Sequence, residues 1–190
     1  LNEICRESVF LERNRNREIE IEFTSPDEPV SVRCDSRQIS GALTNILKNA
    51  AESIEARIAE QGRDSGPGWI GVTLLASHQA DDAGEPLDEV RIVVEDNGKG
   101  LPPDLDRLTE PYVTTREKGT GLGLAIVRKI MEDHHGSLIL EPREPVGAKI
   151  TLSIAESGDD DGTNDGADKS SADEEQRAIE VAVNLGPGSK

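Results

Sequence analysis

The stretch Lys118–Val127 reads K-G-T-G-L-G-L-A-I-V and places three glycines at alternate positions directly before an apolar helical pattern. Glycine lets the backbone approach a ligand closely. A glycine loop that leads into a helix points free N–H groups and the positive end of the helix dipole at a bound anion, typically phosphate. The spacing matches neither the dinucleotide fingerprint, because Leu124 replaces its third glycine, nor the phosphate loop G-x-x-x-x-G-K-[ST]. A flexible turn before a core helix would look the same, so the interpretation depends on the rest of the chain.

The composition limits the class of protein. The 190 residues suffice for one domain of ordinary size with an appendage. Only 2% of them are aromatic, so we expect an aliphatic core. The formal net charge of −17 argues against a nucleic-acid-binding surface, which needs a basic footprint. Cys5 and Cys34 lack metal-ligand spacing and suit a reducing compartment.

Three features of the sequence bear on its boundaries and on membrane targeting. No apolar run approaches the roughly 20 residues of a membrane span, and no signal peptide opens the sequence. The chain starts inside a helical pattern over 1–13, which indicates a piece of a longer protein. From Glu156 onward, ten acidic residues stand against three basic ones, so we expect disorder there, with a transient helix at 177–185.

Local patterns predict the order of helices and strands. Residues 18–23 alternate between charged and apolar side chains, as a half-buried strand does, and 30–33 could pair with them. Asp35 or Ser36 caps a long helix that reaches about Ala59. Further elements are expected in this order: strands at 69–76 and 90–95 joined by a polar hairpin tip at 78–89, a lid-type loop at 101–120, a helix at 122–133, and a closing hairpin of 137–140 and 149–154.

Two asparagines lie one turn apart on the long helix. Asn45 and Asn49 share a face near its apolar stripe. They could be two surface amides. They could equally hold a hydrated Mg²⁺ ion and phosphates, because Mg²⁺ keeps several waters and takes few protein ligands.

The segment Asp96–Gly100 reads D-N-G-K-G and directly follows a predicted strand. Asn-Gly is a strong hairpin signal, but Leu101-Pro102-Pro103 follows where a second strand would be needed. An aspartate at a strand end can accept a hydrogen bond from an exocyclic amine, and the glycines let a flat ring lie against the backbone. Farther along, T-E-P-Y-V-T-T at 109–115 is either an ordinary loop or an aromatic anchor, Tyr112, that docks the lid over a nucleotide.

These four segments, called boxes below, resemble in their order the ATP-binding domain of sensor histidine kinases. That domain belongs to the GHKL superfamily, which also contains gyrase and MutL. The phrases most similar to nitrogen-regulation sensor kinases of the NtrY type are LTNILKNAAESI (43–54), VEDNGKGLP (94–102), TEPYVTT (109–115) and KGTGLGLAIVRKI (118–130). The resemblance covers about residues 1–155. Each box alone is weak, but four in this order and spacing are specific.

The resemblance implies an α/β fold class. The expected architecture is a two-layer α/β sandwich, the Bergerat fold, in which a mixed, mainly antiparallel sheet packs on three helices and ATP lies between the helices and a lid. The domain would span 1–155, with 1–15 as the end of a linker from preceding dimerisation helices. Residues 156–190 would form the acidic tail.

The resemblance also assigns a site by matching position. Asn45 and Asn49 would be the catalytic residues, with Mg²⁺ on Asn49 and the phosphate side of ATP at Asn45. Asp96 would bind the adenine amino group. Further nucleotide contacts would come from Gly98, Gly100, Tyr112, Thr115, Arg116, Lys118, Gly119, Thr120, Gly121, Leu122 and Gly123.

Position 45 separates two classes of enzyme. In the superfamily's ATPases a glutamate at the matching place activates water, whereas the amide of Asn45 cannot act as a general base. We therefore expect little hydrolysis and phosphoryl transfer to a neutral histidine instead. His78 lies in the expected hairpin tip, and His134-His135-Gly136 reads as a helix C-cap, so the acceptor would precede Leu1.

Glu52 is a departure, because many relatives have a basic residue one turn after Asn49, and it leaves the phosphate contacts of this helix open. The implied partners are the dimerisation domain that carries the acceptor histidine and an NtrX-like response regulator, with no nucleic acid and no membrane contact by this segment. The implied location is the cytoplasmic side of a parent anchored in the bacterial inner membrane. The alternatives are a same-fold ATPase, a serine-kinase regulator, or a non-catalytic docking module.

Overall fold

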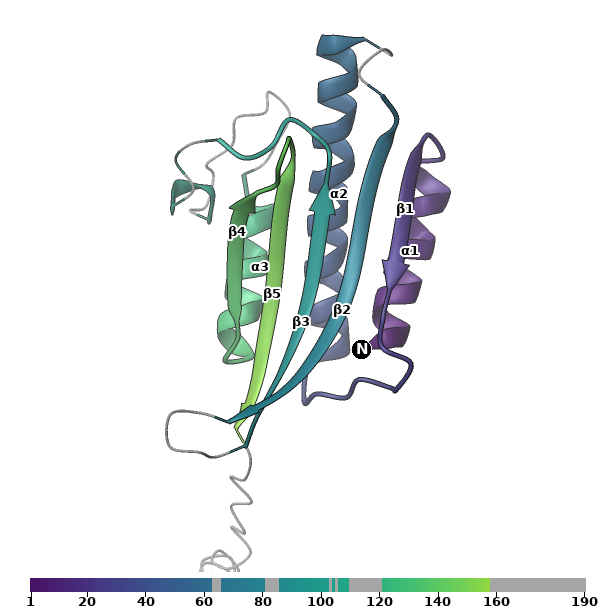
Figure 1. Cartoon of the computed structure of the whole chain (residues 1–190). Helices are drawn as coiled ribbons and strands as arrows, with labels where there is room; N and C mark the ends of the chain where they lie inside the picture. Colours follow the sequence, from purple (N-terminus) through teal and green to yellow (C-terminus); the bar gives the residue numbers. More distant parts are fainter. Residues whose placement is uncertain (63–65, 81–85, 103, 105, 110–120, 158–190) are drawn as a thin grey trace, which may run out of the picture. The chain divides into compact units, whose positions relative to one another are not determined.

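A computed structural model describes residues 1–157 except 63–65, 81–85, 103, 105 and 110–120. In this part of the chain, one five-stranded sheet carries three α-helices on one of its faces (Figure 1). The helices are α1 (Asn2–Arg15), α2 (Ser36–Gln61) and α3 (Gly123–Asp133), with a short 3-10 helix η2 (Asp106–Thr109). The strands are β1 (Ile19–Thr24), β2 (Gly68–Ala80), β3 (Pro86–Asp96), β4 (Ser137–Pro142) and β5 (Ala148–Ser157).

The strands lie in the order β1-β2-β3-β5-β4. The β1–β2 pair is parallel, and the three other pairs are antiparallel. Parallel neighbours need a crossover connection, which α2 supplies here. The predicted two-layer α/β sandwich with a mixed, mainly antiparallel sheet is therefore confirmed.

Helix α2 is the central element of the helical layer. Its first turn is capped by Asp35, whose carboxylate accepts hydrogen bonds from the backbone N–H groups of Arg37 at 2.9 Å and Gln38 at 3.2 Å. These bonds lower the pKa of the Asp35 carboxyl group. The apolar stripe faces the sheet, and its largest fully buried members are Ile39, Leu43, Ile46, Leu47 and Ile54. The predicted cap and stripe are both confirmed.

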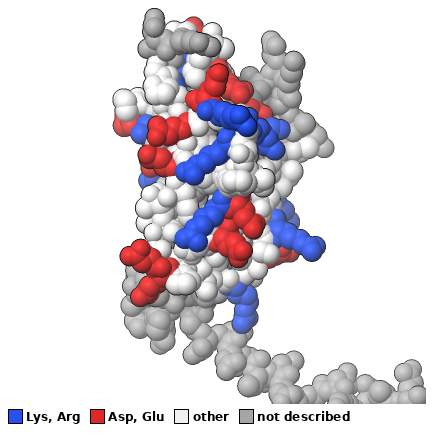
Figure 2. Space-filling model, turned by 90° about the vertical axis from the view of Figure 1, so that its right-hand side faces the viewer, with Lys and Arg blue, Asp and Glu red and all other residues white. Residues whose placement is uncertain are grey.

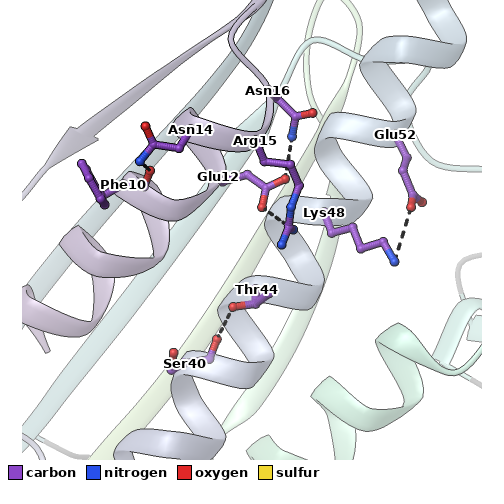
Figure 3. Close-up of polar contacts among 9 residues, drawn as sticks. All are labelled: Phe10, Glu12, Asn14, Arg15, Asn16, Ser40, Thr44, Lys48 and Glu52. Atoms are coloured by element: carbon purple, nitrogen blue, oxygen red, sulfur yellow. Dashed lines mark hydrogen bonds and ion pairs between the residues drawn. The ribbon is translucent and has the colours of Figure 1, made fainter.

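Helix α1 packs its apolar side into the same core, where Cys5 and Val9 are buried. The molecular face that includes α1 shows basic and acidic side chains interspersed (Figure 2). One acidic residue, Glu12, is nevertheless buried, at 2% exposure. Its carboxylate accepts hydrogen bonds from Arg15 at 3.0 Å and from the Asn16 amide at 2.6 Å, which compensates for its removal from water (Figure 3).

The burial of Cys5 leads to a first prediction. Desolvation raises the pKa of its thiol from 9.0 to about 11, so the neutral thiol dominates in the folded protein. Since the thiolate is the reactive form, we expect a thiol reagent near neutral pH to modify folded Cys5 far more slowly than unfolded Cys5. Stability from the buried neutral thiol is complete below pH 9.0 and declines as the pH rises through about 11.

A Cys34→Ser variant isolates this effect, because it leaves Cys5 as the only cysteine. Its native state should release almost no chromophore from a colorimetric thiol reagent. Addition of denaturant should then release one equivalent. Rapid reaction of the native variant would contradict the burial of Cys5.

Two strand expectations were wrong. Residues 30–33 form no strand with β1. Instead, the backbone N–H of Val30 donates to the Asn2 side chain at 2.8 Å, which holds the segment against the start of α1, and β1 pairs with β2. The polar segment 78–89 is mostly strand, because the β2–β3 ladder continues to the pair Ala80–Pro86. Backbone pairing there does not depend on apolar side chains.

The C-terminus of α3 confirms the predicted cap. His134 is the C-cap, His135 has a φ of 51°, and the N–H of Gly136 bonds to the carbonyl of Met131 at 2.8 Å. The His134 ring also joins two helices. Its Nε2 accepts the backbone N–H of Asp35 at 2.9 Å, while its Nδ1 lies 2.7 Å from the carbonyl oxygen of Ile130.

Candidate functional site

The asparagine box (residues 43–54) and the described end of the glycine box (residues 118–130) meet between α2 and α3. A Cβ atom placed on Gly123 would lie 3.6 Å from Nδ2 and 3.9 Å from Oδ1 of Asn49. The side-chain amide of Asn49 is therefore in van der Waals reach of the residue at which α3 begins. Asn45 lies one turn earlier on the same helix, and both asparagines are partly exposed.

The glycine box leads into the N-terminus of α3. Gly121 has a φ of +66°, a conformation that favours glycine. The N-cap residue is Leu122, whose own side chain makes no cap hydrogen bond. A helix start of this kind presents backbone N–H groups to an anion. At Gly121 the described end of the glycine box thus has a backbone conformation that residues with a side chain rarely adopt.

The aspartate box lies against another part of α2. A Cβ atom placed on Gly98 would lie 2.3 Å from the Ser53 hydroxyl oxygen, so only glycine fits there without movement of α2 or the loop. The next residue, Lys99, donates its backbone N–H to that hydroxyl at 3.1 Å and forms an ion pair with Glu60. The loop therefore follows the surface of α2 closely.

Asp96 ends β3 at the base of this loop and is 3% exposed. Its Oδ1 accepts the backbone N–H of Gly98 at 2.7 Å, a buried hydrogen bond that fixes the orientation of the carboxylate. A fixed carboxylate in an environment of low water content can discriminate strongly between a donor and an acceptor on a ligand.

Two further contacts hold the same loop. The Asn97 side chain accepts the N–H of Trp69 and donates to the carbonyl of Pro67, each at 2.9 Å. Gly147, between β4 and β5, approaches so closely that a Cβ atom on it would lie 1.8 Å from the carbonyl oxygen of Asp96. The loop is thus held by α2, by the segment before β2 and by the β4–β5 turn.

Glu52 forms an ion pair with Lys48, with Nζ and Oε1 3.8 Å apart (Figure 3). The acidic side chain that departs from the expected basic residue is thus accompanied by a cation one turn away. Both side chains are substantially exposed, so the pair contributes little to stability. Its relevance is electrostatic, because it offsets a negative charge next to Asn49.

The structure brings together only part of the predicted site. Asn45, Asn49, Asp96, Gly98, Gly100, Gly121, Leu122 and Gly123 belong to the described residues. The other predicted contacts lie outside them, namely Tyr112, Thr115, Arg116, Lys118, Gly119 and Thr120. For these six residues the assignment stays a prediction.

The donor set suits Mg²⁺ shared with a nucleotide. Among the described residues, no cluster of three or more His, Cys, Asp or Glu side chains could hold a metal ion. The asparagine box instead offers amide oxygen, a hard donor, and Asn49 lies beside the start of α3. Mg²⁺ often takes only one or two protein ligands and completes its shell with water and phosphate oxygens, so the residues present fit this ion.

A comparison of the sequence with models of protein families decides the family. Residues 34–158 match the model described as "Histidine kinase-, DNA gyrase B-, and HSP90-like ATPase". The chain belongs to this family. The matched region contains all four sequence boxes as well as α2, β2, β3, α3, β4 and β5.

The resemblance to NtrY-type kinases is confirmed by a curated relative. The chain is 48% identical over 160 residues to the nitrogen regulation protein NtrY of Azorhizobium caulinodans, an alignment that covers 83% of this chain and 19% of that protein. The chain thus spans about a fifth of the length of the NtrY-type relatives it matches. No helix in the described residues is long and apolar enough to cross a membrane.

Solved histidine kinases share the fold. The nucleotide-free catalytic domain of the histidine kinase ThkA superposes with a TM-score of 0.64 at 32% identity, covering 81% of this chain and 91% of that chain. Full-length ShkA in complex with AMPPNP superposes with a TM-score of 0.61 at 26% identity, covering 81% of this chain and 30% of that one.

Sequence reasoning missed three residues that shape the site. Ser53 and Gly147 contact the loop after β3, and Asn97 belongs to that loop and bonds it to Trp69 and Pro67. Ser53 could have been found, because it follows Asn49 by four residues and so shares its helix face. Asn97 and Gly147 carry no such local signal, since their partners are far away in the sequence.

Proposed function

We propose that this domain binds Mg²⁺–ATP and transfers the γ-phosphoryl group to a histidine of a sensor kinase's dimerisation domain, for relay to a response regulator. The observation that carries the proposal is the convergence of three boxes on one helix. Asn49 lies beside Gly123, and one turn farther along α2 Ser53 lies beside Gly98, next to Asp96. A single helix thereby links a phosphate-binding motif to a base-binding motif.

Each part of the site has a chemical task. The buried carboxylate of Asp96 accepts a hydrogen bond from the adenine amino group, and Gly98 and Gly100 shape the pocket by letting the loop pack against Ser53 and Gly147. The backbone at Gly121 and Gly123 and the side chain of Asn45 contact the phosphates. Asn49 supplies the amide oxygen for Mg²⁺, which when bound neutralises charge on the phosphates. ShkA, with the same fold, was solved with the ATP analogue AMPPNP.

Asn45 favours transfer over hydrolysis. Its amide has no basic group that could activate water. A neutral imidazole needs no such base, because its nitrogen lone pair forms the new P–N bond while the bond from the γ-phosphorus to the ADP oxygen breaks. The work of the domain is then to hold the phosphoryl group in line with the incoming nitrogen.

The finer parts of the proposal rest on relatives. Similarity to NtrY supports a role in nitrogen regulation, an NtrX-like response regulator as the final acceptor, and a parent protein anchored in the bacterial inner membrane with this domain on the cytoplasmic side. A same-fold ATPase or serine-kinase regulator is the alternative within the fold.

The test combines the chain with a separately purified dimerisation domain of an NtrY-type kinase and ATP radiolabelled on its γ-phosphate. We expect Mg²⁺-dependent label on the dimerisation domain that is lost in acid and stable in alkali, as a phosphohistidine is. A variant of that domain without its acceptor histidine should stay unlabelled. Rapid phosphate release without transfer would favour an ATPase, and label on serine would favour the serine kinase. Absence of ATP binding would favour a docking module.

A further inference from the structure

We propose that Ser53 is a positioning residue that sets the preference of this domain for adenine, by fixing the loop that orients Asp96. The inference rests on the proposed nucleotide binding and adds a residue that none of the four sequence boxes assigns to this role. It links α2, in the helical layer, to the recognition of a base at the end of β3.

The first step is the contact between Ser53 and the loop. The Ser53 hydroxyl oxygen accepts the backbone N–H of Lys99 at 3.1 Å. The preceding residue, Gly98, packs so tightly on Ser53 that an added Cβ would lie 2.3 Å from the hydroxyl oxygen and 2.8 Å from the Ser53 carbonyl carbon. Ser53 therefore fixes both the height of the loop above α2 and its position along the helix.

The second step passes from the loop to the carboxylate. The N–H of Gly98 donates to Asp96 Oδ1 at 2.7 Å, and this bond is buried. Any displacement of Gly98 from α2 lengthens or bends that hydrogen bond, whose strength falls steeply with poor geometry. The orientation of the Asp96 carboxylate thus depends on Ser53 through Gly98.

The dependence has a specific consequence for nucleotide choice. Adenine presents an amino group at position 6 to the Asp96 carboxylate, whereas hypoxanthine presents a carbonyl oxygen that cannot donate to it. A less well oriented carboxylate weakens only the interaction with adenine. Because the hydrogen bond to the carboxylate is weakened and not removed, we expect an affinity loss of about threefold to tenfold, smaller than the loss for removal of a hydrogen bond to a charged group.

The test is a Ser53→Ala substitution in the whole chain. The dissociation constants of ATP and inosine triphosphate with Mg²⁺ are measured by calorimetry for wild type and variant. We expect the variant to bind ATP about threefold to tenfold more weakly and inosine triphosphate unchanged, so that the preference for ATP narrows by the same factor. Hydrogen exchange of the Lys99 amide without nucleotide should become faster.

The control is Thr44→Ala on the same helix. The Thr44 hydroxyl is exposed and donates to the Ser40 carbonyl at 2.8 Å, away from the loop (Figure 3). This variant should bind both nucleotides as the wild type does. If Ser53→Ala weakened the binding of ATP and of inosine triphosphate equally, or changed neither affinity, the role of Ser53 would be overturned but the proposed function would not. A wild-type chain that binds neither nucleotide would overturn the proposed function as well.

Discussion

The substitution Asp96→Asn is expected to weaken ATP binding about a hundredfold while the domain stays folded. Asp96 is 3% exposed, and its Oδ1 is fixed by the N–H of Gly98. In the variant the amide oxygen keeps that bond, so the amide NH₂ takes the place of the second carboxylate oxygen. Two donors then face each other where the adenine amino group should bind, and an unpaired donor in a buried site is costly.

The measurement is titration of the variant with ATP and with inosine triphosphate. The NH₂ group can donate to the carbonyl oxygen of hypoxanthine, so we expect the preference to reverse toward inosine triphosphate. Asp133→Asn is the matched control, because Asp133 is an exposed α3 carboxylate paired with Lys129. It should leave both affinities unchanged. Wild-type ATP affinity in Asp96→Asn would refute the assigned role of Asp96.

The second large effect is expected for Gly147→Ala. The new Cβ would lie 1.8 Å from the carbonyl oxygen of Asp96, and the φ of +124° at this position is strained for any residue with a side chain. We expect the free energy of unfolding to fall by about 3 kcal/mol, the sum of overpacking and backbone strain. The melting temperature should then fall by about 6–12 °C for a domain of this size.

A glycine-to-alanine substitution at an exposed helical position should instead raise the free energy of unfolding. Gly41 lies exposed within α2, and a Cβ atom there meets nothing within 4 Å. Gly41→Ala should therefore stabilise the domain by about 0.5–1 kcal/mol, because alanine loses less backbone entropy in a helix than glycine. Thermal unfolding followed by circular dichroism compares the two variants. If Gly147→Ala melted at the same temperature as the wild type, the close approach at Gly147 would relax without cost.

Local chemistry explains which parts of the fold could be predicted. The α2 helix followed from the cap at Asp35 and from an apolar stripe, both of which depend on residues within a few positions of one another. The partner of β1 could not be predicted in this way. It pairs with β2, across the whole of α2, and the sequence alone offered the nearer segment 30–33 instead.

The residues of the candidate site likewise fall into two groups, those with a local sequence signal and those whose role depends on distant contacts. The residues proposed to bind the nucleotide, Asn45, Asn49 and Asp96, stand in recognisable boxes because the proposed chemistry requires particular side chains. The supporting residues carry no such signal, because Gly147 lies outside the boxes and Ser53 and Asn97 lie inside two of them without an assigned role. Gly147 is indispensable only because the chain folds back against Asp96, a contact between positions about fifty apart that no local pattern reveals.

The parallel pair of β1 with β2 has a practical consequence for the boundaries of a recombinant fragment. The family model begins at residue 34, after β1. A fragment trimmed to that limit would lose α1 and β1, although Cys5, Val9 and Ile21 belong to the buried core. It would also make β2 a new sheet edge with unpaired backbone groups, which favours self-association. A recombinant fragment should therefore start upstream of α1, well before the four sequence boxes.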